Sequence, residues 1–378
     1  MTKWSSRTKV FLATILLTTA SPLIARAEAQ SDAIASIDPA VRDAVQKQGF
    51  GGYVLVEFHG KPVFSKGYGY ADREKKIPFR IDTIAQIGSL TKSMTAFAIL
   101  SLAREGKIDI EKPVKTYLPG AAEPAASATI HQLLTHHAGL TDHCGDDFDL
   151  LTRDTELHKC MAMPLEFTPG EDHYSNMGYS ILAAVVEQLS GQTWEDYERG
   201  HLWKPLGMED TGFARFEGVK PERFAYGYPP GKPRDDVMSN SIAKLHGADW
   251  NLRGNGGTQS TVTDMERYYQ ALSGKIPGIS REVAALMTTP HDHIDGEAWE
   301  GYGFAVRLDK RNQPYRIGFA GSDTVFMSYF GWLPRQDVFI YVVGNNGWDN
   351  VKPVISTVLH ASYKLAGITP GMLQPEKK

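Results

Sequence analysis

The sequence predicts an α+β fold in which one antiparallel sheet, built from both chain ends, is flanked by helices and carries an inserted mainly helical domain. Three observations support this. Alternating β-branched and aromatic residues occur over residues 52–70, and similar short patterns recur over residues 302–343. Between them, from Ser89 to about Leu272, apolar residues recur with helical spacing.

The first strands are expected to form a hairpin. Residues 52–60 alternate in character, and the chain turns at His59-Gly60-Lys61 into a second strand over residues 62–70. The central part then shows a long apolar run that starts at Ser89 and ends near Gly106. Shorter helical patterns cover residues 130–134, 179–189 and 265–272.

The C-terminal third returns to short strands before a last helix. Strand patterns cover residues 302–308, 315–320, 325–333 and 338–343, and the helical pattern covers residues 351–366. We therefore predict a sheet-containing domain from residues 28–85 and 266–378, and a mainly helical domain from residues 86–265. The cleft between them is the expected place for a site.

The first 27 residues resemble an export signal. They contain four basic residues and no acid around a short apolar run, and Ala25-Arg26-Ala27 offers small residues for cleavage. A membrane anchor is the alternative, but the apolar run is short for a membrane span. We predict a periplasmic or secreted protein with no stable membrane anchor after cleavage. The net charge of −4 and the lack of a basic tract argue against nucleic acid as a partner.

The chain has two cysteines, Cys144 and Cys160. In an oxidising compartment they can form a disulfide that closes one loop, a constraint worth about 3 kcal/mol. The alternative, a thiol catalyst, has no support nearby, because no neighbouring group argues for a low thiolate pKa. Whether the two are bonded stays open at the level of the sequence.

Ser89 and Lys92 form a Ser-x-x-Lys pair at the start of the long apolar run. A helix places positions three apart on one face, so Lys92 can stand beside the Ser89 hydroxyl as a base. Free backbone NH groups in the first turn also favour negative charge near Ser89. Two further pairs occur, but Ser6 with Lys9 lies in the charged start of the signal-like segment, and Ser241 with Lys244 lies in a stretch broken by Pro230, Pro233 and Gly247.

Tyr174 and Asn176 form the one Tyr-x-Asn triplet of the chain, just before a predicted helix. A phenol beside a buried ammonium can lose its proton below its usual pKa near 10, and a lysine that loses solvation can serve as a base. Either Lys92 or Tyr174 can therefore take the proton from Ser89. The Asn176 amide can hold Lys92 and donate to a substrate carbonyl.

Taken in order, these motifs resemble the beta-lactamase-related serine hydrolases, which include class C beta-lactamases, DD-peptidases, D-aminopeptidases and esterases. The resemblance covers nearly all of the chain after the signal, including Leu133 to Leu140 and Gly256 to Thr261. It implies the beta-lactamase/transpeptidase-like fold and a covalent acyl-enzyme mechanism. It also implies that Ser89 is the nucleophile and that Lys92 and Tyr174 transfer protons. Asn176 is then a positioning amide.

The third motif of that family departs from the usual pattern. The family has Lys or His, a small residue and Gly on a strand, whereas this chain has Phe319-Ala320-Gly321-Ser322. A phenyl ring can neither fix the acid-base pair nor bind a substrate carboxylate. Gly321 still permits close backbone approach, and the Ser322 NH can join that of Ser89 in an oxyanion hole.

The sequence contains no convincing metal or cofactor motif. His136, His137 and His143, like His291 and His293, lack ligand spacing with a carboxylate partner, and we expect polar loop residues there. We therefore predict an exported serine hydrolase that cleaves small ester or amide substrates, esters preferred. The alternatives are a beta-lactamase or D-amino-acid-specific peptidase, which acts on a peptide substrate, and a non-catalytic cell-envelope binding or sensor protein.

Overall fold

The computed structural model describes residues 22–229, 231–232, 234–295, 298–323 and 325–373. Within this part of the chain, an eight-stranded sheet has the order β2-β1-β12-β11-β10-β9-β8-β7. Its strands are β1 (Gly52–Phe58), β2 (Lys61–Tyr68), β7 (Asp292–Asp295), β8 (Ala298–Glu300), β9 (Ala305–Leu308), β10 (Pro314–Ser322), β11 (Met327–Leu333) and β12 (Val338–Gly344). The pairs are antiparallel. The predicted α+β fold is confirmed.

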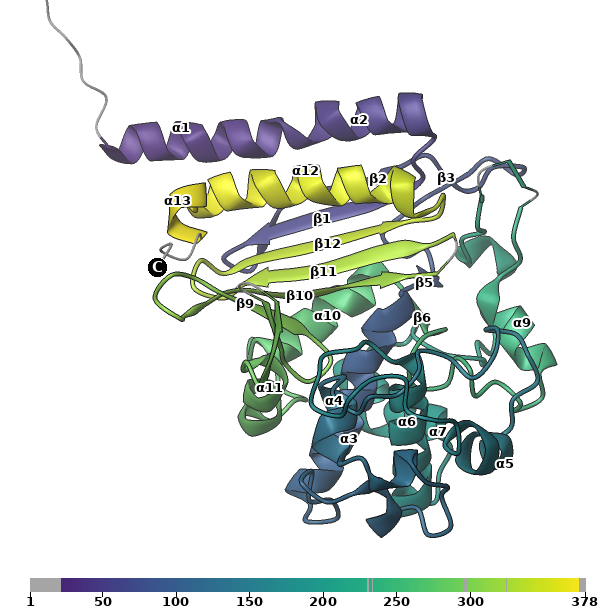
Figure 1. The fold of residues 1–378 in the computed structure, drawn as a ribbon. Coiled ribbons are helices and arrows are strands. Elements are labelled where there is room, and N and C mark those ends of the chain that lie inside the picture. The colour runs from purple at the N-terminus through teal and green to yellow at the C-terminus, as the bar shows by residue number, and fades with distance from the viewer. Residues whose placement is uncertain (1–21, 230, 233, 296–297, 324, 374–378) are drawn as a thin grey trace, which may run out of the picture.

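The join between the two chain ends lies between the second and third strands of the sheet, one strand in from the β2 edge. Strand β1 pairs with β12 over its whole length, from Gly52 opposite Gly344 to Phe58 opposite Val338. Both strands are almost completely buried, because helices cover the two faces of the sheet (Figure 1). The remaining strands are short: β3 (Tyr70–Asp72) pairs with β4 (Ile77–Pro78), and β5 (Ala85–Gln86) pairs with β6 (Gln259–Ser260).

Three helices cover one face of the sheet: α1 (Pro22–Ala35), α2 (Ile37–Gln48) and α12 (Trp348–Ala366) (Figure 1). Their apolar side chains form one hydrophobic cluster with the sheet, around Val41, Val54, Ile340 and Val358. The sequence pattern predicts α12 but neither α1 nor α2. No helix in the described part of the chain is long and apolar enough to cross a membrane.

The other face carries the helical part of the chain (Figure 1). Its helices are α3 (Thr91–Arg104), α4 (Ile130–Leu134), α5 (Arg153–Thr155), α6 (Asn176–Ser190), α7 (Trp194–Glu198), α8 (Lys204–Leu206), α9 (Met238–Lys244), α10 (Val262–Leu272) and α11 (Arg281–Thr288), with α13 (Pro370–Leu373) near the C-terminal end. One large cluster joins α3, α6 and α10 to the sheet. The division into domains at residues 85 and 266 stays a prediction.

Three details differ from the sequence prediction. Strand β9 begins at Ala305 rather than at residue 302, because Gly303 has a φ of 77° and packs directly on the backbone of Ser93. The second hairpin strand ends at Tyr68, since Gly69 has a φ of 60° and separates it from the next strand, β3, which begins at Tyr70. Strands β7 and β8 are too short and polar to show a clear alternation.

The predicted export signal lies largely in residues 1–21, outside the described residues, whereas Ala25 to Ala27 lie within α1.

Candidate active site

Ser89 lies in a short turn that leads into the most buried helix of the helical part. The turn Gly88–Leu90 is a 3-10 helix, and α3 follows directly from Thr91. Ser89 therefore precedes the α-helix that the sequence predicts to begin at this residue. Gly88 takes a φ of 53°, which residues with a side chain rarely adopt. The half-buried Ser89 side chain thus lies at the N-terminal end of α3, where it lines the cleft.

Lys92 is buried in the first turn of α3, with 1% of its surface exposed. Its Nζ lies 3.2 Å from Ser89 Oγ, 2.5 Å from Asn176 Oδ1 and 2.8 Å from the carbonyl oxygen of Asn255. Burial lowers the pKa of Lys92 to about 7, although the nearby Asp142 and Asp147 carboxylates act in the opposite direction. A large fraction of Lys92 is therefore a neutral amine at neutral pH.

The three hydrogen-bond partners of Lys92 Nζ suit a neutral amine. A neutral amine has two N–H donors and one lone pair, and two of the three partners, the Asn176 and Asn255 oxygens, can only accept. The lone pair then points to the third partner, the Ser89 hydroxyl, which can donate. The geometry places an uncharged base on the serine.

Tyr174 completes this arrangement from the opposite side of Ser89. Its hydroxyl lies 2.6 Å from Ser89 Oγ and 3.5 Å from Asn176 Oδ1. The residue is 39% exposed, yet the protein around it raises the pKa of Tyr174 above its usual value near 10. The sequence-based expectation of a lowered phenol pKa is thus wrong, because burial raises the pKa of Tyr174 and the hydrogen bond with Ser89, which acts in the opposite direction, does not outweigh it. Tyr174 is a neutral hydroxyl that can donate to Ser89.

Asn176 is the first residue of α6 and connects Lys92 to the loop at residues 141–150, here called the disulfide loop. Its amide nitrogen Nδ2 lies 3.0 Å from Asp142 Oδ1 and 3.2 Å from His143 Nε2. His143 Nε2 also lies 2.9 Å from the other Asp142 oxygen, so this nitrogen carries a proton and does not accept from Asn176. One Asn176 N–H thus goes to Asp142, and the other stays free of His143.

Strand β10 approaches the Ser89 turn so closely that only glycine fits. A Cβ on Gly321 would lie 1.8 Å from the carbonyl oxygen of Ile87, and a Cβ on Gly88 would lie 2.6 Å from the backbone nitrogen of Ser322. The two glycines therefore bring the Ser322 amide beside the Ser89 turn. The two predicted oxyanion-hole residues, Ser89 and Ser322, thus both line the cleft.

Phe319 occupies the polar position of the third motif and faces Tyr174. The two rings stack with centroids 6.5 Å apart and an angle of 18° between their planes. Phe319 also packs against the large hydrophobic cluster. An uncharged ring thus lies beside Tyr174, at the position where the family resemblance leads us to expect a Lys or His.

The cleft in front of Ser89 has a volume of about 310 Å³ and an acidic lining. Asp147 and Asp323 line it, and no Lys or Arg does so among the described residues. Burial raises the pKa of both carboxyls, that of Asp323 to about 6. The sequence analysis did not find four functional candidates: Asp147, Asp323, Asp142 and Asn255. Isolated acids and amides in loops form no recognisable sequence pattern.

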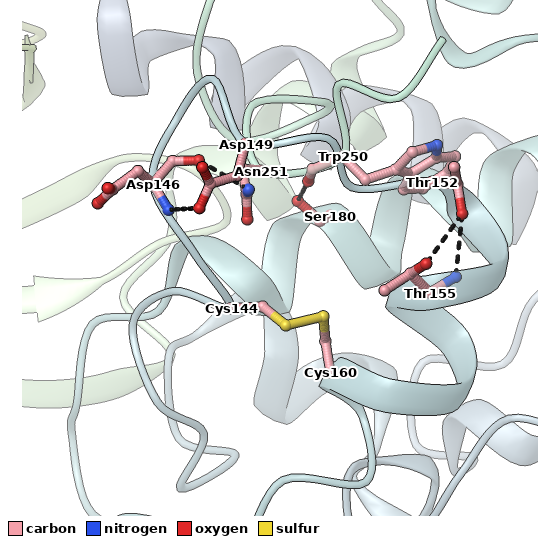
Figure 2. The surroundings of a disulfide bond; sticks show 9 residues. All are labelled: Cys144, Asp146, Asp149, Thr152, Thr155, Cys160, Ser180, Trp250 and Asn251. Carbon is pink, nitrogen blue, oxygen red and sulfur yellow. Dashed lines mark hydrogen bonds between the residues drawn. A yellow bond between two sulfur atoms is a disulfide. The ribbon is translucent and has the colours of Figure 1, made fainter. Parts of the chain in front are cut away.

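The disulfide loop owes its name to the bond between Cys144 and Cys160 (Figure 2). This bond ties the loop to the turn Glu156–Cys160. Further contacts hold the loop internally and against the helical part: Asp149 accepts from the Asp146 backbone, and Asn251 donates to the Asp146 carbonyl (Figure 2). The loop that carries Asp142 and His143 is therefore fixed covalently within one residue of His143.

The remaining sequence candidates lie elsewhere or have structural roles. His136 and His137 are buried rather than solvated loop residues: His136 Nδ1 accepts from the Ser175 backbone at 3.1 Å, and burial lowers its pKa to about 3. The described residues contain no cluster suited to a metal ion. The third Ser-x-x-Lys pair lies on α9, where Lys244 is exposed and pairs with Asp236.

The chain is similar to several known proteins in sequence. The Beta-lactamase family profile matches residues 33–353. Esterase EstB from Burkholderia gladioli is 34% identical over 51% of this chain and 53% of its own length. The Bacillus subtilis protein PbpX is 30% identical over 70% of this chain and 64% of its own length. The chain thus spans between half and two thirds of the length of these two relatives.

Solved structures show the same fold. An octameric penicillin-binding protein homologue from Pyrococcus abyssi superimposes with a TM-score of 0.77 at 25% identity, and covers 90% of this chain and 79% of its own. A class C beta-lactamase superimposes with a TM-score of 0.74 at 20% identity, over 89% of this chain and 96% of its own.

Proposed function

This chain belongs to the beta-lactamase family, and we propose that it is an exported serine hydrolase that cleaves small esters through an acyl-enzyme on Ser89. One observation carries the proposal. Ser89 Oγ lies between the Nζ of Lys92, at 3.2 Å, and the hydroxyl of Tyr174, at 2.6 Å. Burial lowers the pKa of Lys92 to about 7 and raises that of Tyr174, so the amine can accept a proton near neutral pH while the phenol keeps its own.

Acylation follows from these proton positions. As Ser89 Oγ attacks the ester carbonyl, its proton moves to the lone pair of Lys92. The backbone NH groups of Ser89 and Ser322 stabilise the oxyanion, a contribution of roughly 3 kcal/mol per donor in the barrier height. Tyr174 then gives its proton to the leaving alkoxide, and the Lys92 ammonium restores it. Deacylation repeats these steps with water as the nucleophile.

The lining of the cleft supports an uncharged substrate. A substrate carboxylate would meet Asp147 and Asp323 in the cleft, and Phe319 instead of a cation at the third motif. Because an unpaired carboxylate is costly to desolvate, such a substrate binds weakly. The esterase name of one relative, EstB, agrees with an ester substrate. Proteins named for penicillin binding among the structural relatives favour a peptidase as the second candidate.

The export part of the proposal rests on the signal-like segment. Cleavage after Ala27 would remove the four basic residues and release a mature chain into the periplasm or medium. Mass spectrometry of the protein secreted or fractionated from its host tests this proposal. A chain that retains residues 1–27 would contradict it.

The activity test uses a p-nitrophenyl ester and intact-mass detection of the acyl adduct. We expect the wild-type chain to release nitrophenol in a burst and to gain one acyl group on Ser89. Ser89→Ala is expected to lose roughly 10⁴-fold or more in turnover. Ser241→Ala, in the Ser-x-x-Lys pair on α9, is the matched control and should behave as wild type.

Failure of the wild-type chain to form an adduct with any ester, amide or fluorophosphonate would falsify the proposal and leave a binding or sensor role. A strong preference for nitrocefin or for D-amino-acid amides over neutral esters would replace the esterase by the beta-lactamase or peptidase alternative.

A further inference from the structure

We propose that Asp142 is a positioning residue of this active site: its carboxylate holds the Asn176 amide with the oxygen toward Lys92, and so keeps the Lys92 lone pair on Ser89. The proposal rests on the proposed function, in which Lys92 is the base. It concerns the part of the site that no sequence motif marks.

The first step is the double contact between Asp142 and Asn176. A single oxygen, Asp142 Oδ1, accepts from both the backbone nitrogen and the side-chain nitrogen of Asn176, each at 3.0 Å. A carboxylate can only accept, so it selects the NH₂ end of the amide. The opposite end, Oδ1, is thereby directed to Lys92 at 2.5 Å. Asp142 decides which way the amide faces.

The second step concerns the amide turned by 180°. Its NH₂ group would then face Lys92 Nζ and donate to the only lone pair of the neutral amine. That lone pair is the group that must accept the Ser89 proton. The flipped amide would therefore occupy the base, and its oxygen would face the Asp142 carboxylate with no proton between them. A fixed amide orientation separates an available base from a blocked one.

The third step is that Asp142 itself is held. The second carboxylate oxygen lies 2.9 Å from His143 Nε2. The backbone nitrogen of Met177 donates to the Asp142 carbonyl at 3.0 Å, and the Ser175 hydroxyl donates to the Thr141 carbonyl at 2.7 Å. These backbone contacts do not need the Asp142 side chain, so the loop stays docked on α6 when that side chain is changed.

Asp142 also contributes charge, which makes its role measurable. Charged and titratable groups around Lys92 come from several elements: Asp142, His143 and Asp147 from the disulfide loop, His136, Tyr174 two residues before α6, and Tyr179 within α6. Of these, the Asp142 carboxylate is the strongest influence that raises the Lys92 pKa. Its removal should lower that pKa and extend activity to lower pH.

The experiment compares Asp142→Ala and Asp142→Asn on a neutral p-nitrophenyl ester over pH 5 to 9. Asp142→Ala is expected to lower kcat/KM at pH 7 by roughly 100-fold, as expected for a misplaced catalytic group. Asp142→Asn keeps an oxygen that can accept from Asn176 and should recover most of this loss. In both variants the acid limb of the pH profile should move to lower pH.

Asp154→Ala is the control, because Asp154 lies in the same disulfide-linked segment, is 86% exposed at its side chain and pairs with His158. Thermal melts confirm that each variant is folded. If Asp142→Ala keeps the wild-type kcat/KM and its acid limb does not move, the inference is overturned. The proposed function would still stand in that case, because Ser89 of the wild-type chain is labelled. An equal rate loss in both Asp142 variants, without movement of the limb, would also overturn it. Absence of labelling in the wild-type chain would instead refute the proposed function.

Discussion

The two sides of the cleft hold their functional side chains in different ways. On one side, Ser89 and Lys92 come from the turn and first turn of α3, a helix with 11 buried residues. On the other, Asp142 and His143 come from the disulfide loop, which has no regular secondary structure at these residues. Side-chain contacts and one covalent bond hold this second side in place.

The two regions therefore contribute differently to the site. Packing of α3 dehydrates Lys92 and makes it a base, so the reactive atoms sit where the protein is least deformable. The disulfide loop contributes the orientation of Asn176 and, through Asp147, one of the two carboxyls that line the cleft. Changes in α3 should therefore affect the chemical step, whereas changes in the disulfide loop or at Phe319 should affect selectivity, orientation and stability.

The strongest test removes the base from the α3 side. Lys92→Met has a similar volume but no lone pair, so we expect the rate of Ser89 acylation to fall about 10²- to 10⁴-fold. Stopped-flow release of nitrophenol under single-turnover conditions measures it. Lys244→Met, in the exposed pair on α9, is the matched control. Acylation of Lys92→Met at the wild-type rate would show that α3 holds the nucleophile without activating it.

The next test loosens the loop side. Replacing Cys144 and Cys160 by alanine opens a loop whose closure is worth about 3 kcal/mol in the free energy of unfolding. Denaturant unfolding of this double variant, of the oxidised wild type and of the reduced wild type measures the difference. We expect the loss of kcat/KM to be smaller than in Lys92→Met. A double variant as stable as the oxidised wild type would mean that noncovalent contacts alone hold the disulfide loop.

A third test changes the charge beside Tyr174. Phe319→Lys introduces a cation beside Tyr174 on β10. Because a charge-assisted hydrogen bond is worth about 1.5 kcal/mol or more, we expect the preference for an anionic over a neutral substrate to rise roughly tenfold. The ratio of kcat/KM for nitrocefin and a p-nitrophenyl ester measures this preference. Phe319→Leu controls for the lost ring and should leave the ratio unchanged; a ratio that rises equally in both variants would refute a role for charge.

The smallest expected effect concerns Glu156, a carboxyl buried beside the disulfide. Burial raises its pKa to about 8 from the usual 4.5. The folded state thus binds this proton more tightly, so its contribution to stability is complete below about pH 4.5 and declines as pH rises toward 8. Glu156→Gln does not titrate and should gain melting temperature relative to the wild type between pH 5 and 8, on the order of a few degrees.

Glu171→Gln, at an exposed position, is the control for this comparison. A melting-temperature difference for Glu156→Gln that does not change with pH would show that Glu156 keeps the same protonation state in the folded and unfolded chain over this range. Glu156 differs from Lys92 in its hydrogen-bond partners. Both groups are buried, but Lys92 has three partners, whereas Glu156 Oε1 has none among the described residues.

The predictable parts of the fold and site are those with a local signal. Strand β1 and helix α12 show clear periodicity, and Ser89 with Lys92 has both a defined spacing and a helix to carry it. Helices α1 and α2 and strands β7 and β8 lack such signals. Asp142 and Asn255 are likewise invisible in the sequence, because their roles depend on contacts with α6 and α3 rather than on neighbours in the chain.

The sequence by itself determined the antiparallel sheet from both chain ends, the Ser-x-x-Lys pair and the missing cation at Phe319, since residue type, spacing and periodicity are local properties. Only the tertiary structure decided where the protons reside. Tyr174 meets Ser89 across 85 residues of chain, and Asn255 meets Lys92 across 163. A pKa depends on burial and on such distant neighbours, so the low pKa of Lys92 and the raised pKa of Tyr174 emerge only when the chain is folded.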